Sequence, residues 1–155
     1  MHIKWLSRSS LMVAAVVLLV LGRAGDSVWA DGSWEPVGPT GSDPWTFAIS
    51  PAYETDRTIL VGTIQGGILR SIDAGDSWHR VNEGFPNSSF RTMAISPDFD
   101  TDATVFAGSP DGVFRSVDGG VTWQRIDEGI DDTRVMSLAA SPNFAKDSTI
   151  FAGTT

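Results

Sequence analysis

Short apolar segments separated by turn-forming residues follow one another along most of this chain. After residue 30 they come in groups of four, and the first group lies near residues 46–50, 58–63, 68–71 and 78–81. Such segments, bounded by Gly, Pro, Asp and Ser, are typical of β-strands joined by tight turns. The second segment is apolar at the consecutive positions Ile59, Leu60 and Val61, as expected for a strand covered on both faces. No helical periodicity is present after residue 30, so the pattern predicts an all-β domain.

The four-segment unit repeats about every 45 residues. Ala48-Ile49-Ser50-Pro51 returns as Ala94-Ile95-Ser96-Pro97 and again as Ala139-Ala140-Ser141-Pro142. Each copy continues with the pattern S-P-x-[FY]-x-x-D-x-T and then with apolar residues and a Gly. Four antiparallel strands in about 45 residues is the size of one β-propeller blade.

A second motif, S-x-D-x-G-x-[ST]-W, joins the third and fourth segments. The Asp carboxylate can accept hydrogen bonds from backbone N–H groups ahead of it, and the Gly can supply a positive φ. The Trp then leaves the turn as a large apolar anchor, so both copies are expected to bury an equivalent indole. The motif residues are Ser71, Asp73, Gly75 and Trp78 in the first copy and Ser116, Asp118, Gly120 and Trp123 in the second.

This motif resembles the Asp box, or BNR repeat, of sialidases, sortilin-type receptor propellers and the photosystem II assembly-factor family. The resemblance implies a β-propeller in which the box is a structural corner away from any catalytic or binding centre. We therefore expect an all-β fold: a partial β-propeller of about two and a half four-stranded antiparallel blades after an N-terminal signal segment. The expected boundaries are 1–30 for the signal segment, 34–37 for an outer strand, 45–81 and 91–126 for two blades, and 136–154 for a half blade.

Propellers usually close with about 4 to 8 blades. The sequence is thus interpreted as a fragment of a longer protein, and a small propeller assembled from several chains is the rival interpretation. A fragment without a function of its own is a third possibility. Two and a half blades leave open faces, so self-association is expected if the fragment is expressed alone.

Residues 1–30 have the layout of a secretory signal peptide. A basic start precedes an apolar run at residues 11–21, and Val28 and Ala30 offer small residues at a cleavage site. The run is shorter than the roughly 20 residues that span a bilayer. A secreted or periplasmic protein without a membrane segment after cleavage is expected, and a retained N-terminal anchor is the alternative.

The chain is acidic, with a formal net charge of −8 that becomes about −10 once the signal segment is removed. Such a surface repels nucleic acid and anionic lipid. No Cys is present, so disulfides cannot stabilise the exported protein. The expected partner is an unidentified protein or carbohydrate.

The two ends of each unit differ in how closely they repeat. The end with the Ser-Pro and Asp-box motifs repeats closely, whereas the turn between the second and third strands and the loops between units vary. Residues that differ between units at the same structural position are not required for packing of the blade. They are therefore better candidates for binding. The candidate binding residues are Trp45, Gln65, Arg91, Asp111, Asp131, Arg134 and Met136, of which Trp45, Arg91 and Met136 share one repeat position.

The resemblance to sialidases would imply an arginine triad for a substrate carboxylate, a Tyr–Glu nucleophile pair and an Asp that acts as the catalytic acid. The single tyrosine, Tyr53, aligns with Phe99 and Phe144, so that position requires a ring rather than a hydroxyl. No catalytic residues are therefore assigned, and a non-catalytic module is the leading hypothesis. A piece of a secreted sialidase-like glycoside hydrolase is the alternative.

Two arginine pairs, Arg70 with Arg115 and Arg80 with Arg125, occupy equivalent positions and are interpreted as strand residues with solvated heads. Residues 98–102 begin like a calcium loop but lack the Gly and Glu that such a loop requires. Neither a metal nor a cofactor is expected.

Overall fold

The computed structural model describes residues 3–5, 34–36, 38–39, 41–85, 89–130 and 134–155. Blade one consists of β3 (Pro44–Ile49), β4 (Ile59–Thr63), β5 (Ile68–Ser71) and β6 (His79–Arg80). Blade two consists of β7 (Thr92–Ile95), β8 (Val105–Ser109), β9 (Gly112–Ser116) and β10 (Gln124–Arg125). The half-blade consists of β11 (Val135–Ala140) and β12 (Ile150–Thr154).

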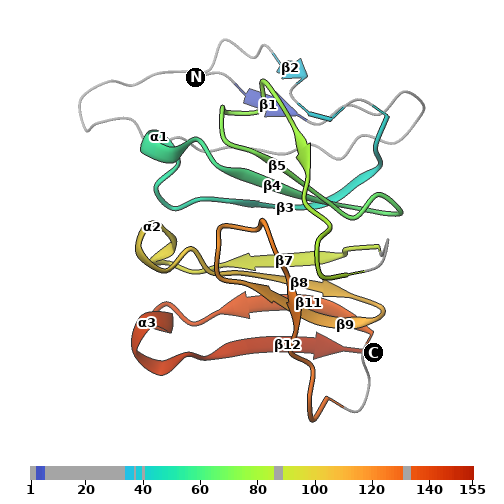
Figure 1. Cartoon of the computed structure of the whole chain (residues 1–155), viewed down its shortest axis with the longest axis vertical. Helices are drawn as coiled ribbons and strands as arrows, with labels where there is room; N and C mark the ends of the chain where they lie inside the picture. Colours follow the sequence, from blue (N-terminus) through green and yellow to red (C-terminus); the bar gives the residue numbers. More distant parts are fainter. Residues whose placement is uncertain (1–2, 6–33, 37, 40, 86–88, 131–133) are drawn as a thin grey trace.

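All three sheets are antiparallel meanders, and they stack in chain order (Figure 1). Their registers match: Ala48 pairs with Leu60 in blade one, Ala94 with Phe106 in blade two, and Ala139 with Phe151 in the half-blade. The fold is a partial β-propeller of two four-stranded blades and one two-stranded half-blade, as the sequence pattern predicts.

Three one-turn helices also lie within this mostly β fold, although the sequence shows no helical periodicity after residue 30. They are α1 (Tyr53–Asp56), α2 (Phe99–Asp102) and α3 (Phe144–Asp147), and they line up along one edge of the stack (Figure 1). In α1 the Ser50 hydroxyl donates to Asp56 Oδ2 at 2.5 Å, and the Thr58 N–H donates to Asp56 Oδ1 at 2.8 Å. The helices are too short to produce a detectable 3.6-residue period, and these polar contacts stabilise them instead.

The repeated Gly of each second strand marks the place where the next blade approaches. A Cβ added at Gly62 would lie 2.8 Å from Phe90 Cβ, and one added at Gly108 would lie 2.7 Å from Val135 Cγ1. Phe90 lies two residues before β7, and Val135 is the first residue of β11, so they are equivalent residues at the start of the next blade's first, or inner, strand. Both are fully buried. Because glycine has no Cβ, this position of the second strand leaves room for the next blade to pack closely.

The main hydrophobic core lies between blades one and two. Its centre is a cluster of edge-to-face rings in which Phe85 packs on Phe90, Phe114 and Trp123, with centroids 4.7, 5.5 and 5.9 Å apart. A smaller cluster between blade two and the half-blade places Phe106 and Phe144 5.4 Å apart. Aromatic packing between sheets is thus a main source of cohesion between the blades.

Strand β2 (Trp34–Pro36) lies within the expected outer strand, but it pairs in parallel with β1 (Ile3–Trp5). The rest of the expected signal segment lies outside the described residues. Within the described residues, no helix is long and apolar enough to cross a membrane.

Candidate functional site

Three exposed side chains mark the start of the three inner strands. Trp45, Arg91 and Met136, here called the inner row, occupy the same repeat position in or beside β3, β7 and β11, which lie next to one another. Trp45 and Met136 each stand at a register shift in the strand pairing. A bulge turns a side chain away from its regular direction, which is common next to binding sites. The structure therefore brings these three predicted residues onto one rim.

The backbone beneath the inner row is held firmly. The Arg91 N–H donates to the Gly108 carbonyl at 3.0 Å, and the Leu138 N–H donates to Thr92 Oγ1 at 3.0 Å, which links β11 to β7. Above this base, Arg91 Nη1 lies 3.3 Å from Met136 Sδ. Among the described residues, the structure shows no carboxylate paired with Arg91, so its guanidinium can hydrogen-bond to a ligand.

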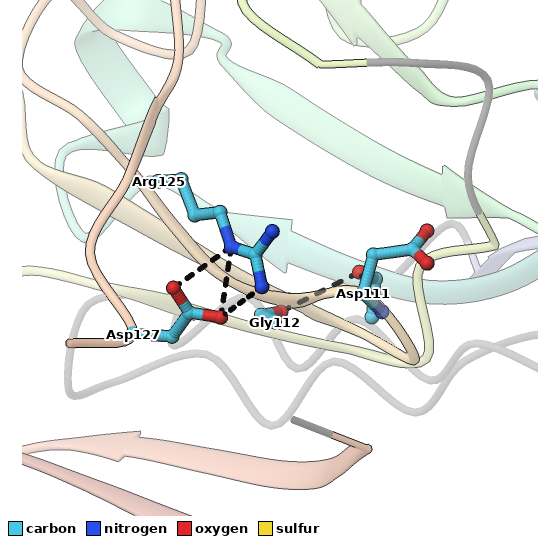
Figure 2. A network of polar contacts seen from close by, with 5 residues as sticks. Asp111, Gly112, Arg125 and Asp127 are labelled. Carbon is cyan, nitrogen blue, oxygen red and sulfur yellow. Dashed lines mark hydrogen bonds and ion pairs between the residues drawn. The ribbon is translucent and has the colours of Figure 1, made fainter. Parts of the chain in front are cut away.

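Gln65 and Asp111 are exposed residues of the turns that join the second and third strands. In blade one, Arg80 Nη1 donates to the Gly66 carbonyl at 2.5 Å. In blade two, Arg125 donates to both oxygens of Asp127 at 2.7–2.8 Å, with Asp111 close by (Figure 2).

The two fourth-strand arginines are exposed strand residues, as the sequence predicts, and each also has a hydrogen-bond partner, which is the Gly66 carbonyl for Arg80 and Asp127 for Arg125. The hydrogen bond between Arg125 and Asp127 raises the pKa of the arginine and lowers the pKa of the carboxyl, and Asp111 adds a further electrostatic contribution at Arg125. Beside Gln65, the Gly66 N–H donates to Thr63 Oγ1 and the Gly66 carbonyl accepts from Arg80. The Asp111 N–H donates to Ser109 Oγ at 3.0 Å. These hydrogen bonds brace the two turns, so Gln65 and Asp111 belong to turns of defined shape.

Asn82 and Asp127 are structural residues that the sequence comparison missed. They occupy equivalent positions, and Asn82 Oδ1 accepts the Ile68 N–H at 3.0 Å while its amide donates to Gly66. The signal was present as an Asn or Asp four residues after each motif Trp. It was weak, because a polar residue beside a turn is common.

The loops between blades separate into a packed part and an exposed part. Phe85, in the connection between blades one and two, is buried at the centre of the aromatic cluster. Arg134 is exposed, one residue before β11. Asp131 lies outside the described residues, so its predicted role stays a prediction.

The turn at residues 71–78, here called the Ser71 corner, has the hydrogen bonds that its sequence predicts. Ser71 Oγ donates to Asp73 Oδ1 at 2.7 Å and accepts the Gly75 N–H at 2.8 Å. Asp73 also accepts the Ser77 N–H at 2.9 Å and the Ser77 hydroxyl at 2.5 Å. These bonds, the side-chain bond from Ser77 first, lower the pKa of Asp73 to about 2.

Residues 116–123, the Ser116 corner, repeat this network. Asp118 accepts hydrogen bonds from the Thr122 hydroxyl at 2.6 Å and the Ser116 hydroxyl at 2.7 Å. Burial raises the pKa of Asp118, but the bonds from Thr122, Ser116 and Val121 outweigh it and lower the pKa to about 2. Both carboxylates are fully engaged in their turns, at the end of the strands opposite the inner row.

The two motif tryptophans are not equivalent, which corrects the sequence prediction. Trp123 is 5% exposed, whereas Trp78 is only half-buried. Both indoles keep the same local bond, from Nε1 to the carbonyl of Gly120 or Gly75. The difference arises because Trp123 packs against blade one, and no described blade precedes Trp78.

The arginines of the third strands differ for the same reason. Arg70 is half-buried, with its Nε buried and without a hydrogen-bond partner, close to Gly119 of the Ser116 corner. Its equivalent Arg115 is exposed and lies 5.9 Å from the centre of the Phe106 ring. The interpretation as a solvated head is therefore wrong for Arg70.

Comparisons with known proteins support the fold. No protein-family model and no curated protein matches the chain. Among solved structures, YCF48 from Cyanidioschyzon merolae is similar with a TM-score of 0.50 and 21% identity, over 66% of this chain and 30% of that one. An ancestral GH74 enzyme, AFV00434, gives a TM-score of 0.36 and 22% identity, over 69% of this chain and 22% of that one. This chain therefore spans less than a third of either structure, and the first similarity shows the propeller fold alone.

Proposed function

We propose that this chain is an exported, non-catalytic module of BNR/Asp-box propeller blades that belongs to a longer protein and binds or assembles with an extracytoplasmic protein or glycan. The observation that carries the proposal is the inner row. Three equivalent positions on adjacent strands are all exposed, yet they carry a large ring, a cation and a thioether. Scaffold positions of the repeat keep their chemistry, so a rim whose chemistry varies is suited to recognition.

The chemistry of the inner row suits a ligand that combines an apolar face with an acceptor group. Trp45 offers a flat surface on which a sugar ring or an aromatic side chain can stack. Arg91 offers planar donors for a carboxylate, hydroxyl or carbonyl. Gln65 and Asp111 lie on the braced turns at the same end of the blades and extend the surface outward.

The test uses a glycan array and a peptide array, both probed with the tagged chain. Trp45→Ala, Arg91→Ala and Met136→Ala should each lower the signal of the ligands bound by the unmodified chain by about tenfold, the loss expected for one good contact. Val117→Ala is the matched control, because Val117 is exposed at the opposite end of the strands. Binding that is lost in the control but kept in the three variants would contradict the site.

Two further measurements address export and the hydrolase alternative. Mass spectrometry of the chain exported by a bacterial host should find a mature protein that begins at Asp31, which is the residue after the expected cleavage site. A fluorogenic sialoside incubated with the chain should remain intact. Release of the fluorophore above the background of a mock purification would favour the glycoside hydrolase.

A further inference from the structure

Met136 is the exposed methionine among the described residues. Its side chain is 43% exposed, whereas Met93 is 8% exposed and belongs to the core between blades one and two. Met1 and Met12 lie outside the described residues. A thioether that solvent reaches is open to oxidation by a peroxide, whereas a buried thioether is protected by its packing. The two described methionines therefore differ in the chemistry that they can undergo.

The exposure of Met136 belongs to its repeat position. Trp45 is 57% exposed and Arg91 is exposed as well, although a further sheet follows each of them in the stack (Figure 1). A following blade therefore leaves the inner-row position in contact with solvent. The exposure of Met136 is thus a property of the inner row rather than of the half-blade.

Met136 is also the hydrogen-bond partner of Arg91. Arg91 Nη1 donates to Met136 Sδ at 3.3 Å, across the boundary between blade two and the half-blade. The strands beneath this contact are fixed relative to each other, because the Leu138 N–H donates to Thr92 Oγ1 at 3.0 Å. A thioether is a weak acceptor, so the bond leaves the guanidinium available to a ligand.

We propose that Met136 is a reversible modification site at which a peroxide controls ligand binding by the inner row, an inference that rests on the proposed function of that row. Oxidation converts the thioether to a sulfoxide. A lone pair of Sδ forms the new S–O bond, the O–O bond of the peroxide breaks, and the departing hydroxide takes the remaining peroxide proton to give water. The sulfur is oxidised and the peroxide is reduced, so no further reactant is required.

The sulfoxide oxygen takes over the hydrogen bond from Arg91. The oxygen is attached to the sulfur that Nη1 already contacts, and the flexible methionine side chain can turn it toward the guanidinium. A hydrogen bond from a charged donor to a polar oxygen is stronger than one to a thioether. Oxidation thus engages the cation and replaces apolar surface with a polar group. Both changes lower the affinity of the inner row for a ligand with an apolar face and an acceptor group.

The first test locates the modification without any ligand. The tagged whole chain is treated with increasing amounts of hydrogen peroxide, and its peptides are analysed by mass spectrometry. Met136 should gain an oxygen at doses that leave Met93 unchanged, and both should react alike in urea, where Met93 is no longer buried. Circular dichroism should be the same before and after treatment. A Met93 that reacts as fast as Met136 in the folded chain would contradict the site.

The second test measures the capture of Arg91, again without a ligand. Nuclear magnetic resonance follows the exchange of the Arg91 guanidinium protons with water, and their signal is assigned by its loss in Arg91→Lys. Exchange should slow on oxidation by about two- to tenfold, the effect of one net hydrogen bond. It should return to its former rate after treatment with methionine sulfoxide reductases. Unchanged exchange in the oxidised chain would overturn the proposal.

The third test repeats the glycan and peptide arrays with the oxidised chain. The signals of the compounds bound by the untreated chain should fall by about tenfold and return after reduction. Met136→Leu is the matched control, because leucine has no sulfur: its treated and untreated samples should give equal signals, whatever their level. Arg91→Ala should lose less on oxidation than the unmodified chain, since it has no guanidinium to capture.

Two array results would overturn the proposal. One is an oxidised chain that binds as well as the untreated chain, and the other is a loss on oxidation that is equally large in Arg91→Ala. Arrays on which the untreated chain binds nothing would instead contradict the proposed function. The mass and exchange measurements use no ligand, so they decide in that case whether Met136 is oxidised and captures Arg91.

Discussion

The backbone N–H of Trp123 donates to the carbonyl of Glu83 at 2.9 Å, which joins the Ser116 corner of blade two to the chain leaving blade one. The neighbouring residue Thr122 forms an isolated bridge with Glu83. The indole side chain of Trp123 lies in the core, where it packs edge-to-face against Phe85. The motif tryptophan is therefore a contact between blades as well as the end of a turn.

Trp123→Ala should lower the free energy of unfolding by about 3–5 kcal/mol, the usual cost of removing a buried large aromatic side chain. Trp78→Ala should cost clearly less, about 1–2 kcal/mol, because part of the Trp78 side chain is already exposed to solvent. Urea unfolding followed by circular dichroism measures both. Equal losses would show that the two indoles are buried alike in solution.

Gly108→Ala should destabilise the chain by about 1–3 kcal/mol, the range for overpacking a close-packed core. The added methyl would lie 2.6 Å from Thr92 Cγ2 and 2.7 Å from Val135 Cγ1. Gly153→Ala is the matched control, because among the described residues its methyl meets only the Ser137 side chain. Thermal unfolding should show a lower Tm for the first variant and a nearly unchanged Tm for the second.

Asp118→Ala should lower stability by about 1 kcal/mol or less, because its hydrogen bonds lie at a solvent-exposed turn. Asp73→Ala should act in the same direction. Neither substitution should change binding at the inner row, which lies at the other end of the strands. A variant that loses binding while keeping its Tm would show that the corners take part in recognition.

The stability of the chain should fall in acid as the two corner carboxylates take up protons. Their pKa values are lowered to about 2 in the folded chain, against an ordinary 3.8. The unfolded chain therefore binds more protons between these values, and the stabilisation present above about pH 4 is lost as the pH falls towards about 2. Asp127 and Asp147, whose pKa values are also lowered, act with the same sign.

The Asp73→Asn, Asp118→Asn double variant should flatten this pH dependence. Thermal unfolding at several values between about pH 6 and pH 2.5 measures the slope, with Asp76→Asn as a control at an exposed acidic position. Identical slopes for the double variant and the unmodified chain would assign the acid sensitivity to other groups.

Local chemistry made much of this protein predictable. The strands at 58–63 and 68–71, the register shared by the three sheets and the two Asp-centred turns follow from residues within a few positions of one another. The Ser71 corner illustrates the reason: Asp73 finds its partners at Ser71 and Ser77, so any chain with this spacing can form the same bonds. The one-turn helices were missed because four residues contain too little periodicity.

Burial was decided by the tertiary structure alone. Leu60 and Phe151, like Trp123 and Trp78, share one repeat position and nearly the same neighbours in sequence, yet one of each pair is buried and the other is not. Their exposure depends on whether another blade lies against them, and that blade is supplied by residues about 45 positions away. The sequence alone determined the shape of each blade and which positions are alike. Only the stacking of the blades decided which of those like positions became core, which became rim, and which remain available for contact, because apolar surface is removed from water by neighbours and not by the residue that carries it.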